Sequence, residues 1–131
     1  MKRIILALAP LLIASAVAAG NTTPQKLMKG FEAQAGSKAS AAAGKKLFTS
    51  KHTGGKPDTP SCTTCHTTNL KAMGRTRVGK PIDPMAISAN RNRLTDQKKA
   101  AKWFRRNCKS VLGRECSAKE KADIIAYFLS L

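Results

Sequence analysis

Cys62-Thr63-Thr64-Cys65-His66 is the stretch of sequence that decides the fold of this chain. It places two cysteines three residues apart and a histidine directly after the second one. This spacing sets both thiols against one edge of a flat macrocycle and brings the next side chain beneath its centre. The motif is the attachment signature of c-type haem. We expect Cys62 and Cys65 to bond covalently to the porphyrin and His66 to bind the iron as proximal ligand.

Two other kinds of site also use a Cys-x-x-Cys pair. A zinc site needs a second pair of ligands at similar spacing, but Cys108 and Cys116 are eight residues apart and no histidine follows His66. A thioredoxin-like redox motif lies in a βαβ pattern, whereas the surrounding chain predicts helix, loop and helix. The sequence therefore predicts one covalently bound haem c as the cofactor.

Residues 1–19 have the pattern of a secretory signal peptide. A basic start precedes an apolar run over residues 4–17, and small residues suited to cleavage follow. The run is too short to span a bilayer comfortably. We expect cleavage after Ala18 or Ala19, a cytochrome domain over residues 20–131, and no stable membrane insertion after cleavage.

The domain that remains is strongly basic. Removing Lys2 and Arg3 from the 24 basic residues leaves 22 against 7 acidic ones, a net charge of +15. Because covalent haem attachment belongs outside the reducing cytosol, we expect a periplasmic protein. There, such a charge predicts an acidic redox partner or an anionic membrane surface, although it could also serve solubility alone. Aromatic and basic residues do not interleave as single-stranded nucleic acid requires, so nucleic acid is not an expected partner.

Helical patterns cover most of the chain outside residues 67–93. That segment contains several Gly and Pro without a sustained period, and we expect it to be irregular chain wrapped round the haem. The sequence therefore predicts an all-α domain. The expected helices span residues 24–35, 41–48, 96–107 and 118–131, with Thr23, Thr95 and a Ser117 to Glu120 capping box at three of their starts.

Three residues within these helices carry expectations about packing. Gly44 costs its helix about 1 kcal/mol relative to alanine, so we expect another helix, the C-terminal one, to approach it closely. Trp103 and Phe104 are expected in the core or in the wall of the haem site.

The ligand on the other face of the iron determines the function. Met28, Met73 and Met85 offer a thioether, His52 an imidazole and Asn107 an amide. By residue type alone, Met85 or Met73 is favoured, because methionine is a usual second ligand in c-type cytochromes. His52 and Asn107 rank lower, since asparagine near the end of a helix usually serves as a cap.

Two further stretches match a known family. They are residues 53–66, TGGKPDTPSCTTCH, and residues 106–116, RNCKSVLGREC. With them, the chain from Thr23 to Leu131 resembles the sphaeroides haem protein family, a class I cytochrome c variant that binds oxygen and nitric oxide. The resemblance implies a class I cytochrome c-like single domain with long haem-wrapping loops.

The resemblance also implies roles for individual residues. Asn107 would be the sixth ligand, displaced on reduction, and Cys108 and Cys116 would form a disulfide. A related cytochrome has histidine at the position of Asn107, which argues against that relative. The implied electron donor is a dihaem cytochrome c linked to a membrane b-type cytochrome.

We therefore expect a periplasmic electron-transfer and gas-binding haem protein. The alternative is a plain electron carrier with a fixed methionine or histidine ligand. An oxidase or reductase of a small nitrogen or oxygen species would use the same open site, but the sequence identifies no catalytic acid or base.

Overall fold

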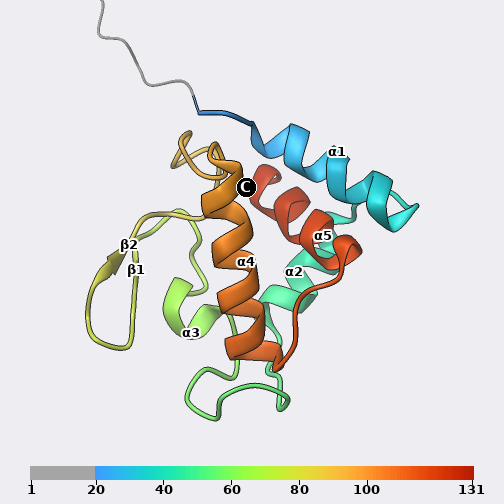
Figure 1. Cartoon of the computed structure of the whole chain (residues 1–131). Helices are drawn as coiled ribbons and strands as arrows, with labels where there is room; N and C mark the ends of the chain where they lie inside the picture. The colour runs from blue at the N-terminus through green and yellow to red at the C-terminus, as the bar shows by residue number, and fades with distance from the viewer. Residues whose placement is uncertain (1–19) are drawn as a thin grey trace, which may run out of the picture.

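The computed structural model describes residues 20–131, so the expected signal peptide lies outside the described residues. This part of the chain is mostly helical, with one short antiparallel hairpin (Figure 1). The expectation of an all-α domain is confirmed, although the hairpin was not expected. The elements are α1 Pro24–Ala35, α2 Ala41–Thr49, α3 Thr63–His66, β1 Gly74–Arg75, β2 Pro81–Ile82, α4 Gln97–Leu112 and α5 Ala118–Leu129.

The crossing of α2 and α5 organises the helical core. A Cβ atom on Gly44 would overlap the backbone carbonyl of Asp123, so only glycine allows the two helices to come this close. The expected close approach at Gly44 is confirmed. Figure 1 shows α1 lying alongside α5, and these two helices also pack together.

Aromatic side chains fill the space between these helices. The ring of Phe48 lies edge-on to Phe128, with centroids 5.3 Å apart, and to Tyr127 at 6.1 Å. Phe128 and Ile125 are almost completely buried. Such edge-to-face pairs add to the free energy gained from burying the rings themselves. This half of the molecule therefore has an ordinary apolar core.

The expected starts of α1 and α5 are confirmed. Thr23 accepts a hydrogen bond from the backbone of Lys26, and Pro24 occupies the first turn of α1. Ser117 and Glu120 form the capping box at the start of α5.

The bounds expected for α4 were wrong at both ends. Asp96, not Thr95, is the N-cap, since its carboxylate accepts a hydrogen bond from the backbone of Lys99. The helix continues beyond Asn107 to Leu112, because no stop signal occurs before Gly113, which adopts a left-handed conformation. Asn107 is therefore an interior residue of the helix, and the alternative interpretation of it as a helix cap is wrong.

Trp103 and Phe104 are neighbours in α4, but only Phe104 is buried. Phe104 is buried and its ring meets Phe31 edge-on, with centroids 6.1 Å apart. Trp103 is 43% exposed, so it is not a core residue, and its expected place in the wall of the haem site stays a prediction. Adjacent positions on a helix point about 100° apart, and only one of the two reaches the interior.

Residues 67–93 are mostly irregular, as expected. The hairpin of β1 and β2 pairs Gly74 with Ile82, and Leu70 and Ala86 anchor the segment in the core. No helix among residues 20–131 is both long and apolar enough to cross a bilayer.

Candidate haem site

One cavity gathers the residues of the Cys-x-x-Cys-His motif. The motif folds into the single turn α3, which has Cys62 at its N-cap position. On the opposite side, α4 contributes Asn107, and the loop before α3 contributes Thr59. The cavity is lined by Thr59, Ser61, Cys62, Cys65, His66, Asn107, Ser110 and Val111.

The two cysteines of the motif are free thiols in a largely buried setting. Neither Cys62 nor Cys65 belongs to a disulfide. Burial, with a smaller contribution from the neighbouring Cys65, raises the pKa of the Cys62 thiol to about 11. Among residues 20–131 no group of three or more His, Cys, Asp or Glu side chains is arranged to hold a metal ion, so the zinc alternative finds no support there.

His66 is suited to binding iron as a neutral imidazole. Burial, together with the positive charge of Arg93, lowers its pKa to about 4. The imidazole therefore stays neutral near pH 7 and keeps a nitrogen lone pair. Its Nδ1 atom is buried without a hydrogen-bond partner in the described part of the chain. A buried polar atom left in this way is unusual, and it fits a site built to receive a further group.

Of the five candidates for the sixth ligand, Asn107 alone is among the residues that line this cavity. His52 lies elsewhere, beside a hollow between α2 and α5, with its Nε2 atom 2.9 Å from the carbonyl oxygen of Leu47. Met28 and Met85 pack against the hydrophobic core, and Met73 is 55% exposed.

A polar seam joins the loop before α3 to the end of α4. The backbone N–H of Lys56 donates to the carbonyl of Ser110 at 2.8 Å, and the hydroxyl of Thr59 donates to the same oxygen at 3.0 Å. A Cβ on Gly55 would overlap that carbonyl, so the two backbones meet directly. The seam lies one turn beyond Asn107, and it therefore fixes α4 relative to the haem-attachment motif.

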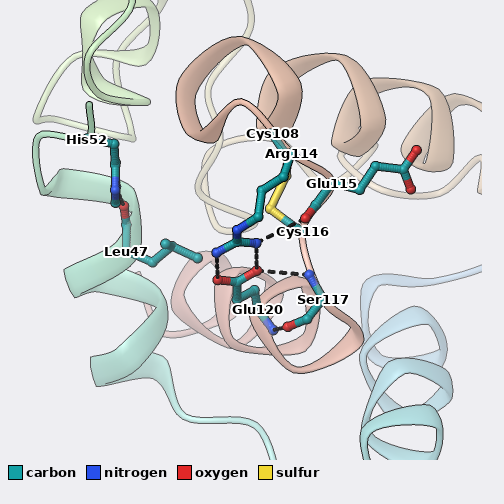
Figure 2. A network of polar contacts seen from close by, with 8 residues as sticks. All are labelled: Leu47, His52, Cys108, Arg114, Glu115, Cys116, Ser117 and Glu120. Atoms are coloured by element: carbon teal, nitrogen blue, oxygen red, sulfur yellow. Dashed lines mark hydrogen bonds and ion pairs between the residues drawn. A yellow bond between two sulfur atoms is a disulfide. The ribbon is translucent and has the colours of Figure 1, made fainter. Parts of the chain in front are cut away.

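A disulfide ties the same end of α4 to the start of α5. Cys108 and Cys116 are bonded, with their Cα atoms 5.6 Å apart. Figure 2 shows the bond beside a polar network in which the Arg114 guanidinium donates to both carboxylate oxygens of Glu120, at 2.8 and 2.7 Å. The pKa of Glu120 is lowered, chiefly by this hydrogen bond.

The sequence analysis missed several residues of the cavity. Ser110 could have been found, because it follows Asn107 by three residues and so shares a face of α4. Thr59 gave no such signal. It lies in irregular chain, and its position depends on a contact with Ser110, far away in the sequence.

Known proteins resemble this chain over most of its length. A family model described as a domain of unknown function, DUF1924, matches residues 34–128. The cytochrome c-type protein SHP of Cereibacter sphaeroides is 51% identical over 115 residues, which make up 88% of this chain and 89% of that protein. Cytochrome c'' of Methylophilus methylotrophus is 42% identical over 71 residues, or 53% of this chain and 49% of that one.

Solved structures lead to the same relatives. Oxidized SHP, described as an oxygen-binding cytochrome c, has a TM-score of 0.83 over 86% of this chain and 100% of its own, at 51% identity. Oxidized cytochrome c'' has a TM-score of 0.67 at 33% identity, over 82% of this chain and 93% of its own. Together with the cavity around the Cys-x-x-Cys-His motif, these matches show that the chain is a c-type cytochrome with haem c as its cofactor and that it belongs to the family of SHP, the sphaeroides haem protein.

Proposed function

We propose that this cytochrome acts in the periplasm and binds small diatomic molecules, such as oxygen or nitric oxide, at its haem. One observation carries the proposal. Asn107, a weak ligand by its chemistry, lines the same cavity as Cys62, Cys65 and His66, while the candidate methionines do not. The description of the relative SHP as an oxygen-binding cytochrome c supports it.

Each residue of the motif has a role in holding the cofactor. Cys62 and Cys65 would attach the macrocycle through thioether bonds, and His66 would present a neutral imidazole to the iron. The haem supplies an iron that changes between ferric and ferrous states and accepts diatomic ligands. The chain determines which side chain competes with those ligands.

Asn107 is that competitor. Its amide oxygen is a hard and neutral donor, which suits ferric iron better than the softer ferrous iron. Asn107 would therefore be the side chain that holds ferric iron, and its weaker affinity for ferrous iron would leave room for a diatomic molecule. A fixed methionine would remain bound in both states and would make the protein a plain electron carrier.

Two structural features support Asn107 in this role. The Cys108–Cys116 disulfide lies next to it in the chain, and the seam of Thr59 with Ser110 lies one turn further along α4. Both restrain the helix that carries the ligand.

The partner and the compartment follow from charge and chemistry. A net charge of +15 on the domain attracts an acidic electron donor over distances of about a Debye length. We propose a dihaem cytochrome c, reduced by a membrane b-type cytochrome, as this donor. Periplasmic export agrees with covalent haem attachment.

Visible spectra of the haem-loaded protein test the proposal. The ferrous form is expected to be five-coordinate and high-spin and to bind nitric oxide promptly. Asn107→Ala should convert the ferric form to a spectrum with water or no sixth ligand, without loss of covalent haem. A six-coordinate, low-spin ferrous form that ignores nitric oxide would overturn the proposal.

Methionine variants are the matched controls. Met73→Ala and Met85→Ala should leave the ferric spectrum unchanged, because neither side chain lines the cavity. If one of them, and not Asn107→Ala, changes the axial ligand, the plain electron carrier becomes the correct description.

A further inference from the structure

The helix that presents Asn107 carries six positive charges and no negative one. All six basic side chains are exposed. Four of them recur at intervals of four, three and four residues, which aligns them along one line of the helix surface. We call these four, Lys98, Lys102, Arg105 and Lys109, the basic stripe. The six are Lys98, Lys99, Lys102, Arg105, Arg106 and Lys109.

The protein does little to neutralise this stripe. Among residues 20–131, the only acidic side chain paired with it is Glu115, 3.9 Å from Lys109. Other acidic side chains pair with cations outside α4, as Glu120 does with Arg114. Like charges one turn apart, such as Lys98 and Lys102, repel and destabilise a helix. The helix α4 is therefore less stable than it would be if acidic residues were interspersed among its basic ones.

The half-exposed Trp103 connects the stripe with the cavity. Its ring has the Lys102 ammonium and the Arg106 guanidinium each 5.5 Å from its centre. These cation–π contacts hold two charged heads in place, which reduces the entropy lost when a partner binds them. Around the helix, Trp103 falls between Lys102 and Asn107, at 100° per residue. Tryptophan and arginine are also the residues that most often dominate binding energy at interfaces.

We infer that the basic stripe, with Trp103 at its edge, is the docking surface for an acidic redox protein, which delivers electrons from the Asn107 side of the haem. The inference rests on the proposed function, in which such a donor reduces the iron. A donor seated here lies one helix diameter, about 10 Å, from the cavity. Docking therefore takes place on the same helix that holds the displaceable ligand.

The reaction at this surface is a transfer of one electron. The reduced donor loses the electron and is oxidised by one unit, and ferric iron gains it and becomes ferrous. No bond to the donor is formed, and no proton is required.

A charge-reversal pair tests the surface, with flavodoxin as the acidic probe. Lys102→Glu with Arg105→Glu alters the stripe, and Lys29→Glu with Lys45→Glu makes the same change of net charge on exposed positions of α1 and α2. At low ionic strength, reduction of the haem-loaded protein by flavodoxin should slow about tenfold or more in the stripe variant, against less than about twofold in the control. The difference should vanish near about 0.5 M salt. Equal slowing in both variants would overturn the inference.

Binding without electron transfer gives a second readout. Backbone amide shifts of the labelled, haem-loaded protein, titrated with oxidised flavodoxin, should change along α4. Changes confined to residues 67–82 would overturn the inference. If the stripe variant folds poorly, Lys102→Gln with Arg105→Gln serves instead, and half the charge change should give a smaller effect of the same sign.

Two further measurements distinguish this inference from the proposed function and from docking on a membrane. Nitric oxide binding after reduction by dithionite tests the proposed function on the same samples, because dithionite needs no docking surface. If the protein does not bind nitric oxide but the stripe variant is still reduced more slowly by flavodoxin than the control, only the proposed function is refuted. Vesicles with anionic phospholipid test the membrane alternative, and a stripe variant that loses vesicle binding but reacts normally with flavodoxin would overturn the docking of a protein here.

Discussion

The α2 and α5 half of the molecule and the half that carries the cavity are stabilised by different interactions. In the first, Phe48, Ile125 and Phe128 form an apolar core between helices. In the second, the chain from residue 51 to residue 96 is largely irregular, and α4 is fixed by backbone hydrogen bonds and a disulfide as well as by the buried Phe104.

The difference has a physical reason. Irregular chain cannot satisfy its backbone internally or bury a continuous apolar face. The cavity half therefore relies on a few specific contacts, such as Thr59 with Ser110, and on the haem as a large apolar surface. The comparison teaches that the apolar half mainly sets the stability of the protein, whereas the cavity half sets the chemistry at the haem. The following variants test this division.

The largest effect is expected in the apolar half, from Gly44→Ala. The new methyl group would overlap the carbonyl of Asp123 and push α2 away from α5, at a cost of about 3 kcal/mol. Denaturant unfolding of the haem-loaded protein measures this cost. Gly30→Ala in α1 is the control, since nothing lies within 4 Å of its Cβ, and it should stabilise the protein by about 0.5 to 1 kcal/mol. Equal stabilities for the two variants would break the comparison.

The next effect belongs to the cavity half. Replacing Cys108 and Cys116 by serine removes a crosslink and should cost about 2.5 kcal/mol in the chain-entropy account. Unlike Gly44→Ala, this variant should also change the ferric spectrum, because Cys108 adjoins Asn107. An unchanged spectrum, with loss of the disulfide verified by mass, would show that the disulfide does not position the ligand.

A smaller effect is expected at the seam. Thr59→Val removes a buried hydroxyl that donates to the carbonyl of Ser110, which still accepts from Lys56, so the loss should be about 1 kcal/mol. Thr49→Val is the control, because its hydroxyl bonds the carbonyl of Lys45 on an exposed face of α2. Only the Thr59 variant should alter the rate of nitric oxide binding, measured by stopped flow. If both variants bind nitric oxide at the same rate, the seam has only a structural role.

The smallest effect concerns the exposed ion pair in Figure 2. The pKa of Glu120 lies below its ordinary value of 4.5 because Arg114 donates to the carboxylate. The pair therefore contributes stability above that ordinary pKa, and the contribution is lost as pH falls through the lowered value. The contribution should be small, because solvent screens this pair. Glu120→Gln should reduce the loss of stability below about pH 4.5, and an identical acid profile would refute this.

Much of the helical half could be predicted from local pattern. Thr23 with Pro24 and the Ser117 capping box act within a few residues of themselves, so their effects are written in the sequence. The bounds of α4 were harder to predict. Thr95 and Asp96 are both good caps, and only the folded backbone selects between them.

By itself, the sequence determined the haem-attachment motif, the helical class and the excess of positive charge, because each depends on neighbouring residues or on composition. The tertiary structure decided which candidate ligand lines the cavity with His66. Asn107 reaches it because α4 continues to Leu112 and is fixed there by the seam and the disulfide. The contacts of the seam join residues about 50 positions apart, and no local pattern of the chain encodes them.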